Sequence, residues 1–124
     1  MPRNVLIVED TELCRDSLEV ALGRVPGVEV QSVATAEEAI ERLSSHDFCA
    51  VVTDLDLPQM DGFELIRTIR SQPRPSPLPI LVISGHSDPS TPSRVVELGA
   101  NAYFSKPYSP AEVRHRLEQL IDGS

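Results

Sequence analysis

The chain has 124 residues, a length that fits one domain built around a single hydrophobic core. No apolar run approaches the roughly 18 residues that a membrane-spanning helix requires. The formal net charge is −8, from 19 acidic and 11 basic residues, so most of the surface should repel nucleic acid and anionic lipid. The N-terminus lacks the apolar stretch of a secretory signal. The sequence therefore predicts a cytoplasmic protein that binds neither DNA nor membrane.

The two cysteines, Cys14 and Cys49, lie in no metal-binding spacing such as Cys-x-x-Cys. A disulfide is not expected in a cytoplasmic protein. We therefore interpret both residues as small, partly buried apolar side chains.

Five short segments have the apolar pattern of β-strands. Continuous apolar runs at residues 4–8, 49–52 and 78–83 are typical of central parallel strands that are covered on both faces. Residues 28–33 alternate between apolar and polar, which indicates a half-exposed strand. A shorter apolar run follows at residues 102–104.

Helical periodicity fills the segments that follow these strands. Apolar residues fall on one helical face at 14–25, 36–43, 63–69, 95–98 and 113–121. The second helix should begin after Thr35, which forms a capping box with Glu38. The fourth should end at Gly99, and the fifth should begin with Ser109 as N-cap and Pro110 in the first turn.

A strand and a helix thus alternate five times, which predicts one parallel sheet with helices on both faces and right-handed crossovers. The stretch 72–79 interrupts this alternation with four prolines. It cannot be helix interior and is interpreted as a stiff connection, with an SH3-type ligand as the weaker alternative. The predicted class is α/β.

Polar residues directly follow four of the predicted strands. The first strand leads into Glu9 and Asp10, the third into Asp54, the fourth into Ser84 and the fifth into Lys106. Ligands of open α/β sheets bind beyond the carboxyl ends of the strands. Each residue alone is more often structural, as a helix cap, a turn residue or a solvated charge. Their coincidence at one sheet edge favours a functional site.

The chemistry of such a cluster favours phosphoryl transfer. Packed carboxylates repel one another and titrate together, and oxygen ligands at a partly open site suit Mg²⁺. A carboxylate can attack a phosphoryl group as a nucleophile, in a transfer that depends on positioning and charge neutralisation. We expect Mg²⁺ and the ammonium of Lys106 to bind the phosphoryl oxygens, and Ser84 to donate a hydrogen bond to one of them.

Four segments together resemble the receiver domains of two-component response regulators. They are Val5–Asp10, Val51–Gly62, Ile83–Gly85 and Gly99–Pro107. Their order and spacing match the family as well as their residue types, and the resemblance covers roughly residues 4–121. It implies a single flavodoxin-like (βα)5 receiver domain over residues 1–124, with strand order 2-1-3-4-5.

The resemblance also implies a role for each residue of the cluster. Asp54 matches the phosphoacceptor, Asp10 the direct Mg²⁺ ligand and Glu9 its acidic neighbour, which acts through water. The backbone carbonyl of Asp56 matches a further metal ligand. Lys106 matches the lysine that pairs with the phosphoryl group.

A conformational switch is implied by the same resemblance. Ser84 matches the switch hydroxyl and Tyr103 the aromatic switch position, and the Lys106-Pro107 bond is typically cis in the family. A sensor histidine kinase or phosphotransfer protein would phosphorylate Asp54. The fourth helix, fifth strand and fifth helix would then shift as a surface for a downstream effector protein or output domain. Homodimerisation on activation is left open.

Other functions fit parts of the pattern. A pseudo-receiver binding module never carries phosphate, but such modules usually lose the acceptor, the acids or the lysine. Asp54-Leu55-Asp56 matches the DxD motif of haloacid-dehalogenase-type phosphatases, which carry it near the N-terminus and have a cap domain. A flavin-binding protein is disfavoured because no Ser/Thr/Gly-rich loop follows the first strand. We expect no enzymatic turnover beyond the domain's own phosphoryl transfer and slow autodephosphorylation. The side-chain roles of Asp56 and His86 stay open.

Overall fold

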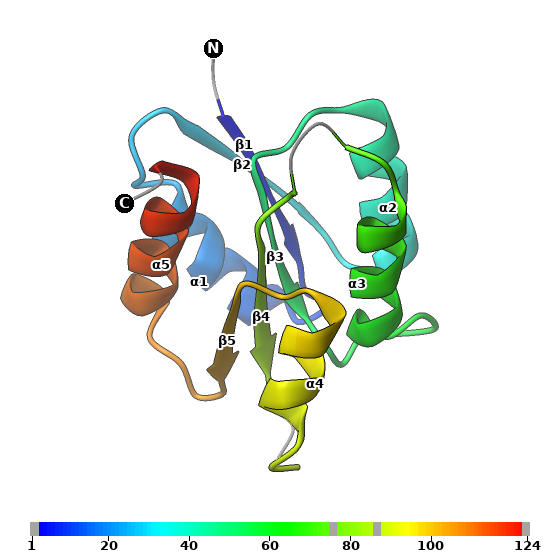
Figure 1. The fold of residues 1–124 in the computed structure, drawn as a ribbon. Helices are drawn as coiled ribbons and strands as arrows, with labels where there is room; N and C mark the ends of the chain where they lie inside the picture. The colour runs from blue at the N-terminus through cyan, green and yellow to red at the C-terminus, as the bar shows by residue number, and fades with distance from the viewer. Residues whose placement is uncertain (1–2, 75–76, 86–87, 123–124) are drawn as a thin grey trace.

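The computed structural model of the chain describes residues 3–74, 77–85 and 88–122. Five parallel strands form one sheet in the order β2-β1-β3-β4-β5 (Figure 1), which confirms the predicted flavodoxin-like topology. The strands are β1 (Arg3–Val8), β2 (Val28–Val33), β3 (Ala50–Asp54), β4 (Ile80–Ser84) and β5 (Ala102–Ser105).

Five helices cover the two faces of this sheet. They are α1 (Glu12–Leu22), α2 (Ala36–Ser45), α3 (Gly62–Ser71), α4 (Thr91–Leu98) and α5 (Pro110–Asp122). Helices α1 and α5 lie on one side of the sheet, and α2, α3 and α4 lie on the other (Figure 1). Within the described ranges, no helix has both the length and the apolar composition to cross a membrane.

The sheet divides the hydrophobic core into two layers, because successive side chains of a strand point to opposite faces. In β1, Leu6 and Val8 pack into the layer under α2, α3 and α4. Val5 and Ile7 pack into the layer under α1 and α5. All four side chains are fully buried, and burial of each contributes about 1.5–3 kcal/mol. The continuous apolar runs of the central strands thus reflect cover on both faces.

Most of the predicted helix ends are confirmed. The hydroxyl of Thr35 accepts a hydrogen bond from the backbone N–H of Glu38 at 3.2 Å. Gly99 ends α4 with a φ of 110°, the left-handed conformation that glycine adopts without steric cost. Helix α5 begins at Pro110, as predicted.

Two boundaries were predicted wrongly. Helix α1 ends at Leu22 although the apolar periodicity continues to Val25, whose side chain is buried beyond the helix end. Strand β4 begins at Ile80 rather than residue 78, because Pro79 contributes its carbonyl to the N–H of Val51 but has no N–H to pair. Apolar periodicity alone therefore does not locate either end.

The N-terminus of α3 lies directly against the end of β3. The N–H of Gly62 donates to the carbonyl of Leu55 at 3.0 Å. A Cβ at position 62 would lie 2.5 Å from the carbonyl oxygen of Asp54 and 2.6 Å from the Cα of Leu55. Asp61 caps the helix by accepting from the N–H of Glu64 at 2.9 Å. Only glycine permits this close approach of α3 to Asp54.

We expect Gly62→Ala to lower the free energy of unfolding by about 1–3 kcal/mol, because the added methyl meets rigid backbone atoms. Urea denaturation would measure this change. Gly85→Ala is the matched control, since a Cβ there would make only an ordinary contact, 3.8 Å from the Cδ of Lys106. Equal stability of the two variants would contradict the assigned role of Gly62.

Candidate functional site

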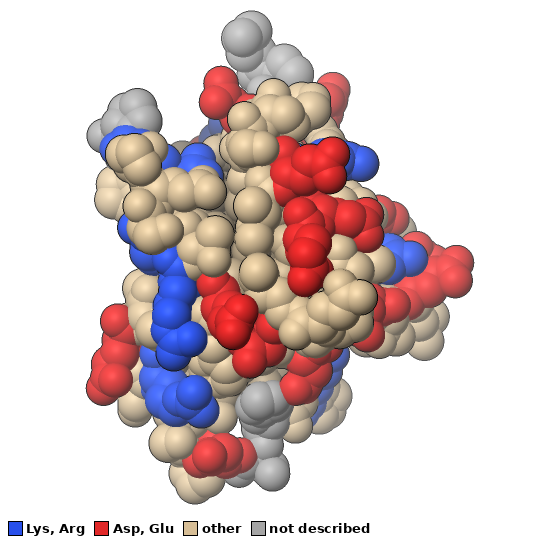
Figure 2. Space-filling view, turned by 90° about the vertical axis from the view of Figure 1, so that its right-hand side faces the viewer, with Lys and Arg blue, Asp and Glu red and all other residues tan. Residues whose placement is uncertain are grey.

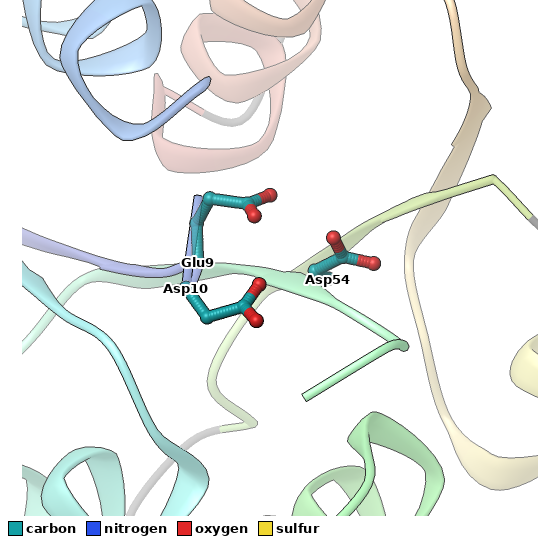
Figure 3. Close-up of side chains that lie close together, drawn as sticks. All are labelled: Glu9, Asp10 and Asp54. Carbon is teal, nitrogen blue, oxygen red and sulfur yellow. The ribbon is translucent and has the colours of Figure 1, made fainter. Parts of the chain in front are cut away.

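Three carboxylates meet at the carboxyl edge of the sheet (Figure 3). Glu9 and Asp10 directly follow β1, and Asp54 is the last residue of the neighbouring strand β3. One carboxylate oxygen from each residue lies within 4.8 Å of the other two. Glu9 and Asp54 are 0% and 1% exposed, whereas Asp10 is exposed. The cluster therefore has a buried floor and one side open to solvent.

Lys106 directs its ammonium into this cluster from the loop after β5. Its Nζ lies 2.6 Å from Oδ2 of Asp54 and 3.5 Å from Oε2 of Glu9. Partial burial alone would lower the pKa of Lys106, but the hydrogen bond to Asp54 and the negative charges of Asp54 and Glu9 outweigh it and raise that pKa. The lysine therefore stays charged. Lys106 is also the only lysine in the chain.

Glu9 carries negative charge that the protein compensates only in part. Its Oε1 accepts from the N–H of Thr11 at 3.0 Å, while its buried Oε2 has no hydrogen-bond partner within the part of the chain described. Burial raises the pKa of Glu9 to about 7, and the charge of Asp54 adds to the effect. Buried oxygens normally have a partner. These carboxylate oxygens are not fully used by hydrogen bonds, and oxygen ligands are the ones that a hard divalent cation such as Mg²⁺ prefers.

Asp56 supports the acceptor through its backbone. Its N–H donates to Oδ1 of Asp54 at 3.0 Å, so both oxygens of the Asp54 carboxylate have a donor. The side chain of Asp56 is exposed and, with Asp10 and Asp61, lines a cavity of about 440 Å³ beside the carboxylates. This cavity offers room for a ligand to approach the cluster from the side of Asp10.

Ser84 and Tyr103 lie on the predicted elements, and their switch roles remain predictions. Ser84 is the fully buried last residue of β4, and its carbonyl accepts from the N–H of Lys106 at 2.7 Å. Tyr103 pairs with Val82 in the sheet and packs, half-buried, on the side of α2, α3 and α4. His86 lies outside the described residues. The Lys106-Pro107 bond is cis, as expected.

Sequence reasoning missed three residues around the site. Thr11 acts on Glu9 through its backbone N–H, and the guanidinium of Arg15 donates to the backbone carbonyl of Glu9 at 2.9 Å. Tyr108 stands beside Lys106, where burial raises the pKa of Tyr108 to about 12. Every residue except proline has a backbone N–H, so the sequence could not indicate that the N–H of Thr11 binds Glu9. Of the three residues, only Tyr108 could have been noticed in the sequence, because it lies two residues after Lys106.

Comparisons with known proteins agree with this geometry. The sequence profile described as "Response regulator receiver domain" matches residues 5–118. The transcriptional regulatory protein GltR of Pseudomonas aeruginosa is 35% identical over 119 residues, which are 96% of this chain and 49% of GltR. The two-component response regulator PhoP of the same species is 38% identical over 120 residues, which are 97% of this chain and 52% of PhoP. The chain thus spans about half the length of these regulators.

Solved structures show the same architecture. A CheY-like receiver domain protein from Methanospirillum hungatei has 27% sequence identity and a TM-score of 0.88, over 99% of this chain and 96% of the other. The receiver domain of the sensor histidine kinase PA1611 from Pseudomonas aeruginosa was solved with a magnesium ion coordinated in its active site cleft. It has 28% identity and a TM-score of 0.85 over the full length of both chains.

The fold and the site define a flavodoxin-like α/β domain with an acidic cluster at the carboxyl edge of its sheet and one lysine ammonium directed into that cluster. The chain belongs to the response regulator receiver domain family of two-component signalling systems.

We expect Glu9→Gln to raise the free energy of unfolding by about 1–2 kcal/mol at pH 8 in EDTA. The buried carboxylate is ionised above its folded pKa of about 7, at a cost that the amide does not have. The gain should shrink as the pH falls to 6, because wild-type Glu9 then takes up a proton in the folded state. Glu29→Gln, at an exposed position on β2, is the control for the charge change. A gain of the same size at pH 6 and 8 would contradict this account.

Proposed function

We propose that this domain is a phosphoacceptor in phosphorelay signalling, phosphorylated on Asp54 in a Mg²⁺-dependent reaction by a sensor histidine kinase or phosphotransfer protein. The observation that carries the proposal is the 2.6 Å contact between Lys106 and Asp54 within a cluster of three carboxylates. A receiver domain covering the whole chain would perform this reaction on itself, without turnover of other substrates beyond slow autodephosphorylation.

The carboxylates of Glu9, Asp10 and Asp54, with the backbone carbonyl of Asp56, would hold the Mg²⁺. The buried Oε2 of Glu9 supports this assignment, because it has only the 3.5 Å ion pair with Lys106 and no hydrogen bond within the described residues. The magnesium ion in the cleft of the PA1611 receiver domain supports it as well. When bound, the cation supplies positive charge that offsets the repulsion between the carboxylates and the incoming phosphoryl oxygens. The exposed position of Asp10 keeps one side of the cluster open to a phosphoryl donor.

The contacts of Asp54 suit nucleophilic attack. Lys106 and the N–H of Asp56 hold one carboxylate oxygen each and so fix the orientation of the group. One Asp54 oxygen forms a bond to the phosphorus while the bond from phosphorus to the donor's nitrogen breaks. The electron pair returns to that nitrogen. Lys106, which keeps its charge, then binds an oxygen of the new acyl phosphate.

The signal would arise from the added charge. Phosphorylation brings about −1.5 to −2 charges and new acceptor oxygens to the end of β3. The hydroxyl of Ser84, at the neighbouring end of β4, donates to one of these oxygens. Tyr103 then turns toward the space that the hydroxyl leaves, and the equilibrium shifts toward a second arrangement of α4, β5 and α5. A downstream effector protein or output domain would bind that surface.

Asp54→Asn should abolish incorporation of phosphate from acetyl phosphate and Mg²⁺, because the amide cannot attack phosphorus. Intact-mass measurement with and without Mg²⁺ would show the wild-type gain and its loss. Asp61→Asn is the matched control, since Asp61 lines the same cavity and Asn keeps its capping function. No mass gain in the wild type would favour a pseudo-receiver, and steady release of phosphate would favour a phosphatase.

Lys106→Ala should leave Mg²⁺ binding intact but uncouple phosphorylation from the change in α4, β5 and α5, because the ammonium no longer binds the phosphoryl group. Calorimetry would measure Mg²⁺ binding. Amide chemical shifts after acetyl phosphate treatment would measure the spread of the conformational change. Shift changes that reach α4 and α5 as in the wild type would overturn the role of Lys106.

A further inference from the structure

Arginines gather over α3 and α4 although the chain as a whole is acidic. Figure 2 looks onto the side of the molecule that carries α2, α3 and α4, and basic side chains form a stripe down this face. Because Lys106 is the only lysine, the stripe consists of arginines. We call Arg67, Arg70, Arg74 and Arg94 the arginine ridge.

The ridge follows the contact between the two helices. Phe63, Arg67 and Arg70 lie on one face of α3, at i, i+4 and i+7. The guanidinium of Arg94, on α4, lies 4.2 Å from the centroid of the Phe63 ring. Arg70 donates to the carbonyl of Gly99, at the end of α4, from Nη2 at 2.7 Å and from Nε at 3.1 Å. Arg94 is therefore held against the start of α3, and Arg70 is held against the end of α4.

The positive charge of the ridge is not neutralised within the described residues, where no ion pair joins any of its arginines to a carboxylate. The pKa of Arg70 is lowered, first by burial and second by repulsion from the positive charge of Arg74. The Nε of Arg74 is buried without a hydrogen-bond partner in the described part of the chain. Arg67 is exposed. The exposed Glu64 lies one turn before it on α3 without pairing to it. A negative ligand would relieve this repulsion.

We propose that the arginine ridge docks a short acidic segment, rich in Asp and Glu, of a partner protein. Guanidinium groups bind carboxylates through two parallel hydrogen bonds. Arg67 and Arg70 lie about one turn apart on α3 and Arg74 follows the end of that helix, an arrangement that suits an extended peptide. The ridge lies outside the carboxylate cluster around Asp54, and it shares only Arg94, on α4, with the proposed switch surface of α4, β5 and α5. The proposal goes beyond the phosphoacceptor function and does not depend on it.

The charge distribution favours a short peptide over other anions. A DNA duplex or an anionic membrane would also meet the acidic remainder of the molecule, including the exposed Glu37 and Glu38 on the same side. A second copy of this chain could offer its acidic α2. That contact would join different surfaces and produce open-ended chains rather than a closed dimer.

Fluorescence anisotropy with a fluorescein-labelled octaglutamate peptide at low ionic strength tests the proposal, with octaglutamine as the uncharged probe. Arg67→Glu should weaken octaglutamate binding by about fivefold or more, since an attraction becomes a repulsion. Arg24→Glu makes the same charge change at an exposed position beyond α1, on the other side of the sheet, and should change binding by less than about twofold. Arg67→Lys keeps the charge and should keep most of the affinity.

Thermal melting of all three variants checks that each is folded. The side chain of Arg67 makes no hydrogen bond within the described residues, so its replacement removes none. The proposal is overturned if octaglutamate does not bind, or if Arg24→Glu weakens it as much as Arg67→Glu. Tighter, Arg67-dependent binding of a DNA duplex or of phosphatidylserine vesicles would also overturn it. Asp54→Asn should leave octaglutamate binding unchanged, because the ridge does not include Asp54. This variant therefore distinguishes a failure of the phosphoacceptor function from a failure of the ridge proposal.

Discussion

The crowding of three carboxylates at one sheet edge is the constraint on which the rest of the site depends. Parallel strands β1 and β3 end side by side and bring Glu9, Asp10 and Asp54 together. A single ammonium, from Lys106, offsets part of their repulsion. Such an arrangement costs stability in the resting protein, because burial raises the free energy of the charged form. In the proposed function, this residual negative charge attracts the cation that offsets the charge of the phosphoryl group.

The fold supplies this arrangement through backbone contacts rather than through a rigid cage of side chains. The carbonyl of Ser84 accepts from the N–H of Lys106 and so fixes where the loop after β5 begins. Gly62 sets α3 against the end of β3. Helix α4 is tied to α3 by Arg70 and Arg94. This arrangement is compatible with the proposed shift of α4, β5 and α5 while the three carboxylates stay in place.

The alternation of strand and helix patterns predicted a parallel sheet, and the polar residues that follow its strands predicted where the site lies. The strand order came from the resemblance to receiver domains. It could not predict how Thr11 and Arg15 hold Glu9, since one contact uses a backbone N–H and the other a backbone carbonyl. The spacing of Arg67 and Arg70 on α3 is visible in the sequence. The place of Arg94 over Phe63 depends on how two separate helices pack, which periodicity does not encode.

The division of the apolar interior by the sheet also bears on how this domain can diverge. Leu6 and Ile7 are neighbours in the chain but belong to separate layers, one under α2, α3 and α4 and the other under α1 and α5. Substitutions in separate layers that do not contact each other change the free energy of unfolding by amounts that roughly add. A lineage can therefore remodel one flank for a new partner while the opposite flank keeps its inherited packing.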